Sequence, residues 1–203
     1  MQGTLFVVSA PSGAGKTSLV KALVESTPNI HVSVSHTTRP QRTGEVDGVN
    51  YHFVSQDRFA AMINDSAFLE QAEVFGSLYG TSKDTVAAKL KSGVDVVLEI
   101  DWQGAQQIRH QAPDAVSIFI LPPSRLVLEQ RLLGRGRDPV EVIRKRMAQA
   151  TEQISHHVEF DYLIINDDFD KALKEMQAVV LAQRLRVLKQ CERHSTLIKS
   201  LLS

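Results

Sequence analysis

Short apolar runs alternate along the chain with longer segments whose apolar residues recur at helical spacing. The runs predict strands at 5–8, 94–100, 116–121 and 162–166, and alternation at 30–34 predicts a half-buried strand. Helices are predicted at 18–25, 82–91, 102–110, 126–133, 138–155 and 168–194. Because right-handed helical crossovers make successive strands parallel, the pattern indicates an α/β fold, a parallel sheet with helices on both faces. Ligands of such folds bind outside the carboxyl ends of the strands.

Residues 35–82 interrupt this alternation. The segment 35–50 is polar and rich in turn residues, and short strands are predicted at 51–54 and 68–75. Ser55 is placed to cap a helix that runs to about Asn64. Since no full-length crossover helix separates these strands, we expect a small, mostly β, inserted subdomain with antiparallel pairing.

The chain of 203 residues fits one main domain with insertions. A glycine-containing break at 134–137 separates two predicted helices and indicates a helical lid. We therefore expect a core in three parts, an insertion and a lid: core 1–34, insertion 35–82, core 83–124, lid 125–155 and core 156–203.

The segment 9–17 has the pattern of a phosphate-binding P-loop, because it joins an apolar strand to a helix and ends in Gly-Lys-Thr. Backbone N–H groups of such a loop and the helix N-terminus bind phosphates. Lys16 is expected to reach the β- and γ-phosphates, and the Thr17 hydroxyl is expected to ligate Mg²⁺. The first glycine of the motif is replaced by Ala10, and an ordinary βα turn is the alternative. The predicted loop residues are Ala10, Pro11, Ser12, Gly13, Ala14, Gly15, Lys16 and Thr17.

Asp101 lies at the carboxyl end of a buried strand in the same predicted sheet as the P-loop strand. A carboxylate there can hold Mg²⁺ or contact a second substrate, and helix capping is the alternative.

In the insertion, Arg39, Arg42 and Tyr51 are suited to clasp a monophosphate; solvated surface charge is the alternative.

Cationic side chains crowd the predicted lid around its glycine break. They are Arg131, Arg135, Arg137, Arg144, Lys145 and Arg146. Such a segment can close over a nucleotide and place arginines on a transferring phosphoryl group. The polar faces of amphipathic helices are the alternative, which explains the Arg-Gly-Arg loop less well.

Composition excludes several classes of protein. The chain is 43% hydrophobic and 23% charged, as ordinary globular proteins are, and its formal net charge of zero argues against a nucleic-acid partner. The single Cys191 excludes an internal disulfide framework and a cysteine-rich metal site. Since no apolar run approaches the ~18 residues of a membrane span, we expect a cytoplasmic protein with no membrane partner.

The chain resembles the guanylate kinases, P-loop nucleoside monophosphate kinases, of the bacterial type. The resemblance covers essentially the whole length and rests on ordered motifs in three separate regions. They are Ser9–Thr17, Ser35-His36-Thr37-Thr38-Arg39, Gly44-Glu45, Asp47-Gly48, Tyr51, Phe53, Phe68-Leu69-Glu70, Tyr79-Gly80-Thr81, Glu99-Ile100-Asp101-Trp102-Gln103-Gly104, Arg135-Gly136 and Asn166.

The resemblance implies two nucleotide sites that meet at the P-loop. For GMP it implies a phosphate site and a guanine site, made by Arg39, Arg42, Tyr51 and Tyr79 and by Ser35, Glu70, Thr81 and Asp101, with Gly80 beside them. For ATP it implies the P-loop together with Arg131, Arg135 and Asn166, and it gives catalytic roles to Lys16, Arg39, Arg135 and Arg146. Mg²⁺ would be the cofactor, held by Thr17 and Asp101, although Glu99 and Asp101 could divide the base and metal roles differently.

The guanine assignment also has a physical basis. Guanine presents N1–H and its 2-amino group side by side, and one carboxylate can accept from both, whereas adenine presents an acceptor at N1. A polar pocket of this kind rejects the wrong base because its buried groups are left unpaired.

The resemblance implies an ATP:GMP phosphotransferase of purine nucleotide metabolism, with ADP and GDP as products. One alternative is a non-catalytic, peptide-binding scaffold, which the intact P-loop disfavours. Another is phosphoryl transfer to a different small acceptor. The oligomeric state stays open.

Overall fold

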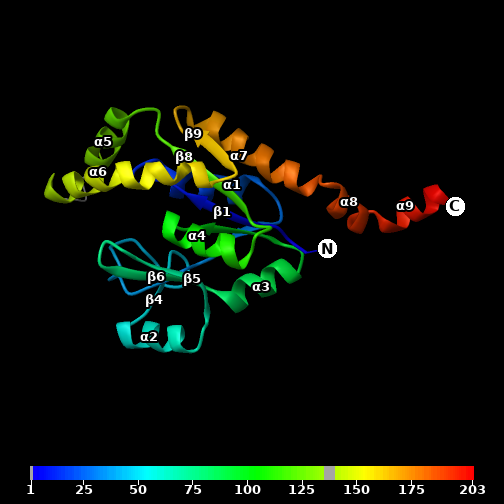
Figure 1. Cartoon of the computed structure of the whole chain (residues 1–203), viewed down its shortest axis with the longest axis horizontal. Helices are drawn as coiled ribbons and strands as arrows, with labels where there is room; N and C mark the ends of the chain where they lie inside the picture. Colours follow the sequence, from blue (N-terminus) through cyan, green and yellow to red (C-terminus); the bar gives the residue numbers. More distant parts are fainter. Residues whose placement is uncertain (1, 135–139) are drawn as a thin grey trace.

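The computed structural model describes residues 2–134 and 140–203, and its centre is a five-stranded sheet (Figure 1). Every pairing within this sheet is parallel, as predicted. Its order is β2 (Ile30–Val32), β7 (Asp95–Glu99), β1 (Leu5–Ser9), β8 (Val116–Leu121) and β9 (Tyr162–Ile165).

Helices cover both faces of the sheet because successive side chains of each strand point to opposite sides. Phe6 and Val8 of β1 belong to one buried cluster, and Leu5 and Val7 belong to another. Helices α1 (Lys16–Ser26) and α7 (Phe169–Arg184) contribute to the first cluster, and α3 (Lys83–Lys91) and α4 (Trp102–Gln111) to the second. The predicted fold class is confirmed.

The insertion forms a second sheet of its own. Its order is β4 (His52–Phe53), β3 (His36–Thr37), β6 (Ser77–Ser82) and β5 (Phe68–Val74), and α2 (Gln56–Asn64) packs beside it. Ser55 caps α2 as predicted, and the rings of Phe59 and Phe68 stack with centroids 4.6 Å apart. Two pairings are antiparallel, but β3 and β4 are parallel. The prediction of purely antiparallel pairing is therefore wrong for that pair, and strands β3 and β6 were not predicted.

The lid segment contains α5 (Arg125–Gly134) and α6 (Val140–Ser155), followed by the short 3₁₀ helix η1 (His156–Glu159). Leu128 and Leu132 of α5 pack on Met147 and Ala150 of α6 in a small core. Arg135, Arg137 and the predicted helix start at 138–139 lie outside the described residues. The lid and the insertion lie at the same end of the molecule (Figure 1).

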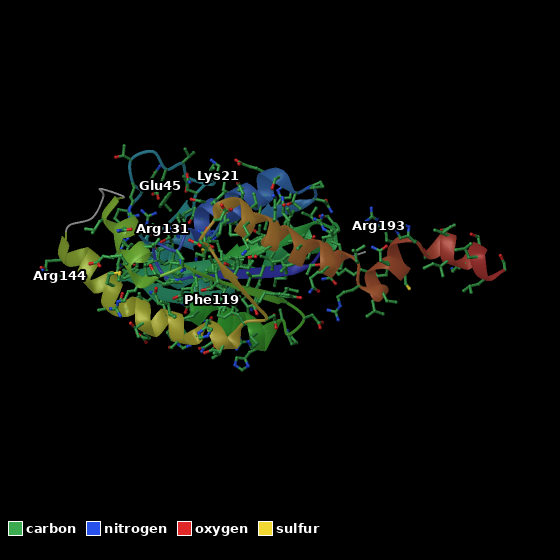
Figure 2. All side chains as sticks on the ribbon, turned by 90° about the horizontal axis from the view of Figure 1, so that it is seen from above. Lys21, Glu45, Phe119, Arg131, Arg144 and Arg193 are labelled. Carbon is green, nitrogen blue, oxygen red and sulfur yellow. The ribbon has the colours of Figure 1, made fainter. Side chains whose placement is uncertain are left out.

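The predicted final helix from Asp168 to His194 is interrupted after Arg184, although 187–193 is helical as predicted. Asp168 caps α7 as expected, but α7 ends at Arg184, and α8 (Val187–Arg193) and α9 (Ser195–Leu202) follow. Arg184 is bound to Asp95 with Nε 2.8 Å from Oδ2, at the end of the sheet. Lys189 of α8 still donates to Thr4 Oγ1 at 2.7 Å, and the rest of the chain extends away from the body, as Arg193 illustrates (Figures 1 and 2). Without a core to pack against, periodicity alone does not sustain one long helix. Among the described residues, no helix is both long and apolar enough to cross a bilayer.

Candidate active site

A cavity of about 600 Å³ lies at the carboxyl ends of β1 and β7. Its lining combines the loop after β1, the insertion, the end of β7 and the lid helix α6, which are far apart in sequence. Most of the predicted site residues meet here: Ala10, Ser12, Gly13, Gly15, Lys16, Thr17, Ser35, Arg39, Arg42, Tyr51, Glu70, Tyr79, Asp101 and Arg146.

The P-loop takes a conformation that needs glycine. Gly13 and Gly15 have φ angles of 95° and 98°, in the left-handed region that side chains disfavour. A Cβ on Gly15 would also lie 2.3 Å from Asn166 Nδ2, so the loop and Asn166 approach each other too closely for a side chain. Lys16 Nζ donates to the carbonyl of Ile100 at 2.8 Å, and desolvation lowers the pKa of this ammonium against the opposing charges of Glu99 and Asp101.

Arg131 and Asn166 contact the P-loop but are not among the residues that line the cavity. Asn166 Nδ2 donates to the carbonyl of Ala14 at 2.7 Å, and Arg131 Nη2 donates to the carbonyl of Asn166 at 3.0 Å. Because Arg131 Nη1 also donates to the carbonyl of Ala14 at 3.5 Å, Arg131 connects lid helix α5 to the loop. Pro11 and Ala14 are also not among the lining residues. Their predicted role is therefore limited to shaping the loop.

Glu99 is the carboxylate nearest to the Thr17 hydroxyl. Thr17 Oγ1 donates to Glu99 Oε1, in a short hydrogen bond from the start of α1 to the end of β7. Asp101 instead caps α4, since its Oδ1 accepts from the backbone N–H of Gly104 at 3.0 Å. The capping alternative for Asp101 thus holds, although this residue also lines the cavity.

Hard oxygen ligands suit Mg²⁺, which binds proteins through one or two carboxylates and substrate phosphates. Thr17 and Glu99 supply a hydroxyl and a carboxylate at the P-loop. No group of three or more His, Cys, Asp or Glu residues that could form an all-protein metal cage occurs in the described part of the chain. The donor set therefore fits a metal that arrives with a phosphate ligand.

Glu70 is a buried carboxyl group in the wall of the cavity, with only 3% of its surface exposed. Thr81 Oγ1 donates to Glu70 Oε1 at 2.5 Å, and Ser35 Oγ lies 3.3 Å from Thr81 Oγ1. Burial raises the pKa of Glu70 to about 7, and the Thr81 hydrogen bond opposes this shift. A Cβ on Gly104 would lie 2.5 Å from Glu70 Oε2, so the missing side chain of α4 makes room for the carboxyl group.

The predicted phosphate clasp lies in the insertion. Arg39 Nη2 pairs with Glu45 Oε1 at 2.7 Å, and Arg39 Cζ lies 5.4 Å from the ring centroid of Tyr51. The rings of Tyr51 and Tyr79 are 5.8 Å apart. Burial, with the nearby charge of Glu99, raises the pKa of Tyr51 to about 12, so its hydroxyl remains a hydrogen-bond donor. Gly80 stays behind this clasp, because its backbone packs against the ring of Phe68.

Glu45 and Gln153 are two of the lining residues that were not predicted as site residues. Glu45 fixes the arginine loop, since it also accepts from the backbone N–H of Arg42 at 2.8 Å. Gln153 Oε1 of α6 accepts from the backbone N–H of Ser12 at 3.2 Å and so joins the lid to the P-loop. Glu45 lies within a motif of the resemblance, and Gln153 follows Arg146 by two helical turns, a spacing that places both on one face.

Sequence comparison decides the family to which this site belongs. A family model described as guanylate kinase matches residues 2–183. The chain belongs to the guanylate kinase family. It is 61% identical over 201 residues to the guanylate kinase of Saccharophagus degradans, covering 99% of this chain and 98% of that protein. It is 58% identical over 204 residues to the guanylate kinase of Escherichia coli strain K12, covering 100% and 99%.

The fold agrees with a solved guanylate kinase. The crystal structure of guanylate kinase from Anaplasma phagocytophilum matches with a TM-score of 0.78 and 32% identity, covering 93% of this chain and 89% of that one. Because the guanylate kinase match spans the P-loop, the insertion and the lid, the chain is a kinase, that is, a phosphotransferase.

Proposed function

We propose that this protein transfers the γ-phosphoryl group of Mg²⁺-ATP to GMP and releases ADP and GDP. The observation that carries the proposal is that one cavity is lined both by the P-loop and by the buried Glu70 carboxyl group. Identity of 58–61% to guanylate kinases over the full chain supports the same reaction.

The donor site is assigned to the P-loop. Its backbone N–H groups and the N-terminus of α1 bind the phosphates, and Lys16 neutralises charge on the β- and γ-phosphates. Asn166 and Arg131 both donate to the carbonyl of Ala14 and so hold the loop from its carbonyl side. Mg²⁺ would be held by Thr17 and Glu99, where it neutralises charge on the β- and γ-phosphates.

The acceptor site is assigned to the insertion. Ionised Glu70 accepts from N1–H and the 2-amino group of guanine, and the hydroxyl of Ser35 is the donor for O6. Thr81 uses its single hydroxyl hydrogen on Glu70 and so orients the carboxylate. Arg39, Arg42, Tyr51 and Tyr79 bind the phosphate of GMP. We assign residues 35–82 to GMP binding, 125–155 to the lid, and 1–34, 83–124 and 156–203 to the core.

The transfer needs no protein nucleophile. An oxygen of the GMP phosphate attacks the γ-phosphorus, and the bond from that phosphorus to the β–γ bridging oxygen breaks, so that ADP leaves. Lys16, Arg39 and Arg146 stabilise the charge that spreads over the transferred group, and Arg135 is assigned the same role. Closure of the lid excludes water that would otherwise hydrolyse ATP. We further propose a cytoplasmic location, with ATP and GMP as partners and neither nucleic acid nor membrane.

An acceptor panel tests the proposal. Purified protein with Mg²⁺-ATP is given GMP, IMP, AMP, CMP and UMP, and ADP release is followed. We expect GMP to exceed every other acceptor in kcat/KM. The Lys16→Ala variant should lose ~10²–10³-fold in kcat while GMP affinity stays unchanged, because Lys16 belongs to the donor site. Preference for another acceptor would refute the GMP assignment, and wild-type turnover of Lys16→Ala would refute the donor site.

A further inference from the structure

The turn of the hairpin in the insertion contains Phe75, a residue type that the backbone conformation of this turn disfavours. Strands β5 and β6 are joined by the two residues Phe75 and Gly76, and Val74 pairs with Ser77. Both turn residues have positive φ, 52° and 76°, which is typical of a type I′ turn and favours Asn-Gly. Phenylalanine rarely occupies this left-handed region because its Cβ crowds the backbone. Turn formation therefore does not account for an aromatic side chain at Phe75.

The ring of Phe75 faces the cavity instead of a core. The residue is 51% exposed and belongs to the cavity lining. The guanidinium carbon of Arg146 lies 5.4 Å from its ring centroid, within the range of cation–π attraction. Phe75 comes from the insertion and Arg146 from lid helix α6, so this contact joins the two segments that close around the substrates.

We propose that Phe75 is a positioning residue for Arg146, whose guanidinium its ring holds over the cavity in the orientation needed for phosphoryl transfer. The inference rests on the proposed transfer of phosphate to GMP. Phe75 acts through Arg146 and not on the reacting atoms. Strained aromatic residues that persist at a cavity are expected where the strain serves the site.

The size of the effect follows from the contact. A cation–π interaction at a partly exposed site favours one orientation of an arginine by roughly three- to thirtyfold. Loss of the ring should slow the transfer step by that factor. Affinity for GMP should not change, because the base and phosphate contacts are assigned to residues such as Glu70 and Arg42, away from the turn.

Two variants separate positioning from folding. Phe75→Asn removes the ring and supplies the residue that a type I′ turn prefers, so its Tm should equal or exceed that of the wild type. Phe75→Tyr keeps both the ring and the strain. Single-turnover rates are measured by rapid quench with saturating Mg²⁺-ATP and limiting GMP, and the Kd of GMP by calorimetry. We expect Phe75→Asn to lose roughly three- to thirtyfold in rate with unchanged Kd, and Phe75→Tyr to stay within about twofold of the wild type.

A double-mutant cycle with Arg146→Ala tests the route of the effect. If Phe75 acts through Arg146, Phe75→Asn should change the rate by less than about twofold in the Arg146→Ala background. Independent losses that multiply would overturn the proposal, as would an unchanged Phe75→Asn rate or a raised Kd for GMP. If Phe75→Asn lowers the Tm and Phe75→Tyr does not restore the rate, Phe75 serves folding, and the proposal is likewise overturned. If the wild-type protein forms no GDP, the proposed function itself is refuted. That result differs from every outcome that would overturn only the role of Phe75.

Discussion

The hydroxyl of Thr81 donates to the carboxyl group of Glu70, with Oγ1 2.5 Å from Oε1, in the wall of the cavity. This bond fixes one carboxyl oxygen of a side chain that is almost fully buried. The same side chain lies against Gly104 of α4, where a methyl group has no room. Three elements therefore set the position of one carboxyl group, which suits a reader of hydrogen-bond donors on a base.

Gly104→Ala should damage GMP recognition more than folding. The added Cβ would lie 2.5 Å from Glu70 Oε2, and the end of a glutamate side chain can move aside at small cost. Alanine also favours a helix over glycine by up to ~1 kcal/mol, which supports α4. We expect the KM for GMP to rise at least about tenfold, as for loss of one charge-assisted hydrogen bond. A lowered Tm with normal KM would contradict this reading. Gly134→Ala, where a Cβ meets no atom of the described residues within 4 Å, is the matched control.

Binding of the base should release a proton. The pKa of Glu70 is about 7 in the free protein because burial disfavours its charge, and only the ionised form accepts from both guanine donors. Affinity should therefore fall as pH drops below 7, by up to about tenfold per unit. Guanosine is the suitable ligand, since it has no phosphate that titrates in this range. Calorimetry in buffers of different ionisation enthalpy measures the proton release. A pH-independent affinity, which we expect only for Glu70→Gln, would contradict this linkage in the wild type.

Variants of Glu99 and Asp101 form a matched pair that tests which of the two carboxylates binds Mg²⁺. Glu99 accepts from Thr17, whereas Asp101 caps α4, and asparagine caps a helix about as well as aspartate. Glu99→Gln should raise the Mg²⁺ concentration for half-maximal rate by roughly 10- to 100-fold. Asp101→Asn should leave it within about twofold. If a magnesium titration shows that Asp101→Asn raises this Mg²⁺ concentration and Glu99→Gln does not, Asp101 and not Glu99 is the metal ligand.

The sequence predicted those parts of the fold whose stabilising contacts follow a local pattern. Strand β1, the P-loop and α1 are contiguous, and their apolar periodicity and glycines identify them without tertiary information. Strand β6 was missed because Ser77–Ser82 is polar, contains Gly80 and lacks apolar alternation. Pairing with β5 on one side and β3 on the other forms this strand. The sequence predicted β5 but not β3, and it does not show which strands pair.

The site shows the same limit. Residue types and the family resemblance pointed to Glu70 and Lys16, which line one cavity. The contact between Thr17 and Glu99 depends on the register of β1 against β7, which pairs Val8 with Glu99, and a single sequence does not determine that register. The break after Arg184 was likewise invisible, because it depends on where the body of the protein ends.

Selectivity of Glu70→Gln tests the central claim, that this carboxyl group reads guanine, most directly. Glutamine keeps the size of the side chain but replaces one acceptor oxygen with a donor amide. The measurement is kcat/KM for GMP, IMP and AMP in the wild type and the variant; IMP keeps N1–H and O6 but lacks the 2-amino group. We expect the wild type to prefer GMP over both, and the variant to lose about 10- to 100-fold on GMP and least on AMP. If all three ratios stay unchanged in the folded variant, Glu70 does not read the base and the account of the acceptor site is wrong.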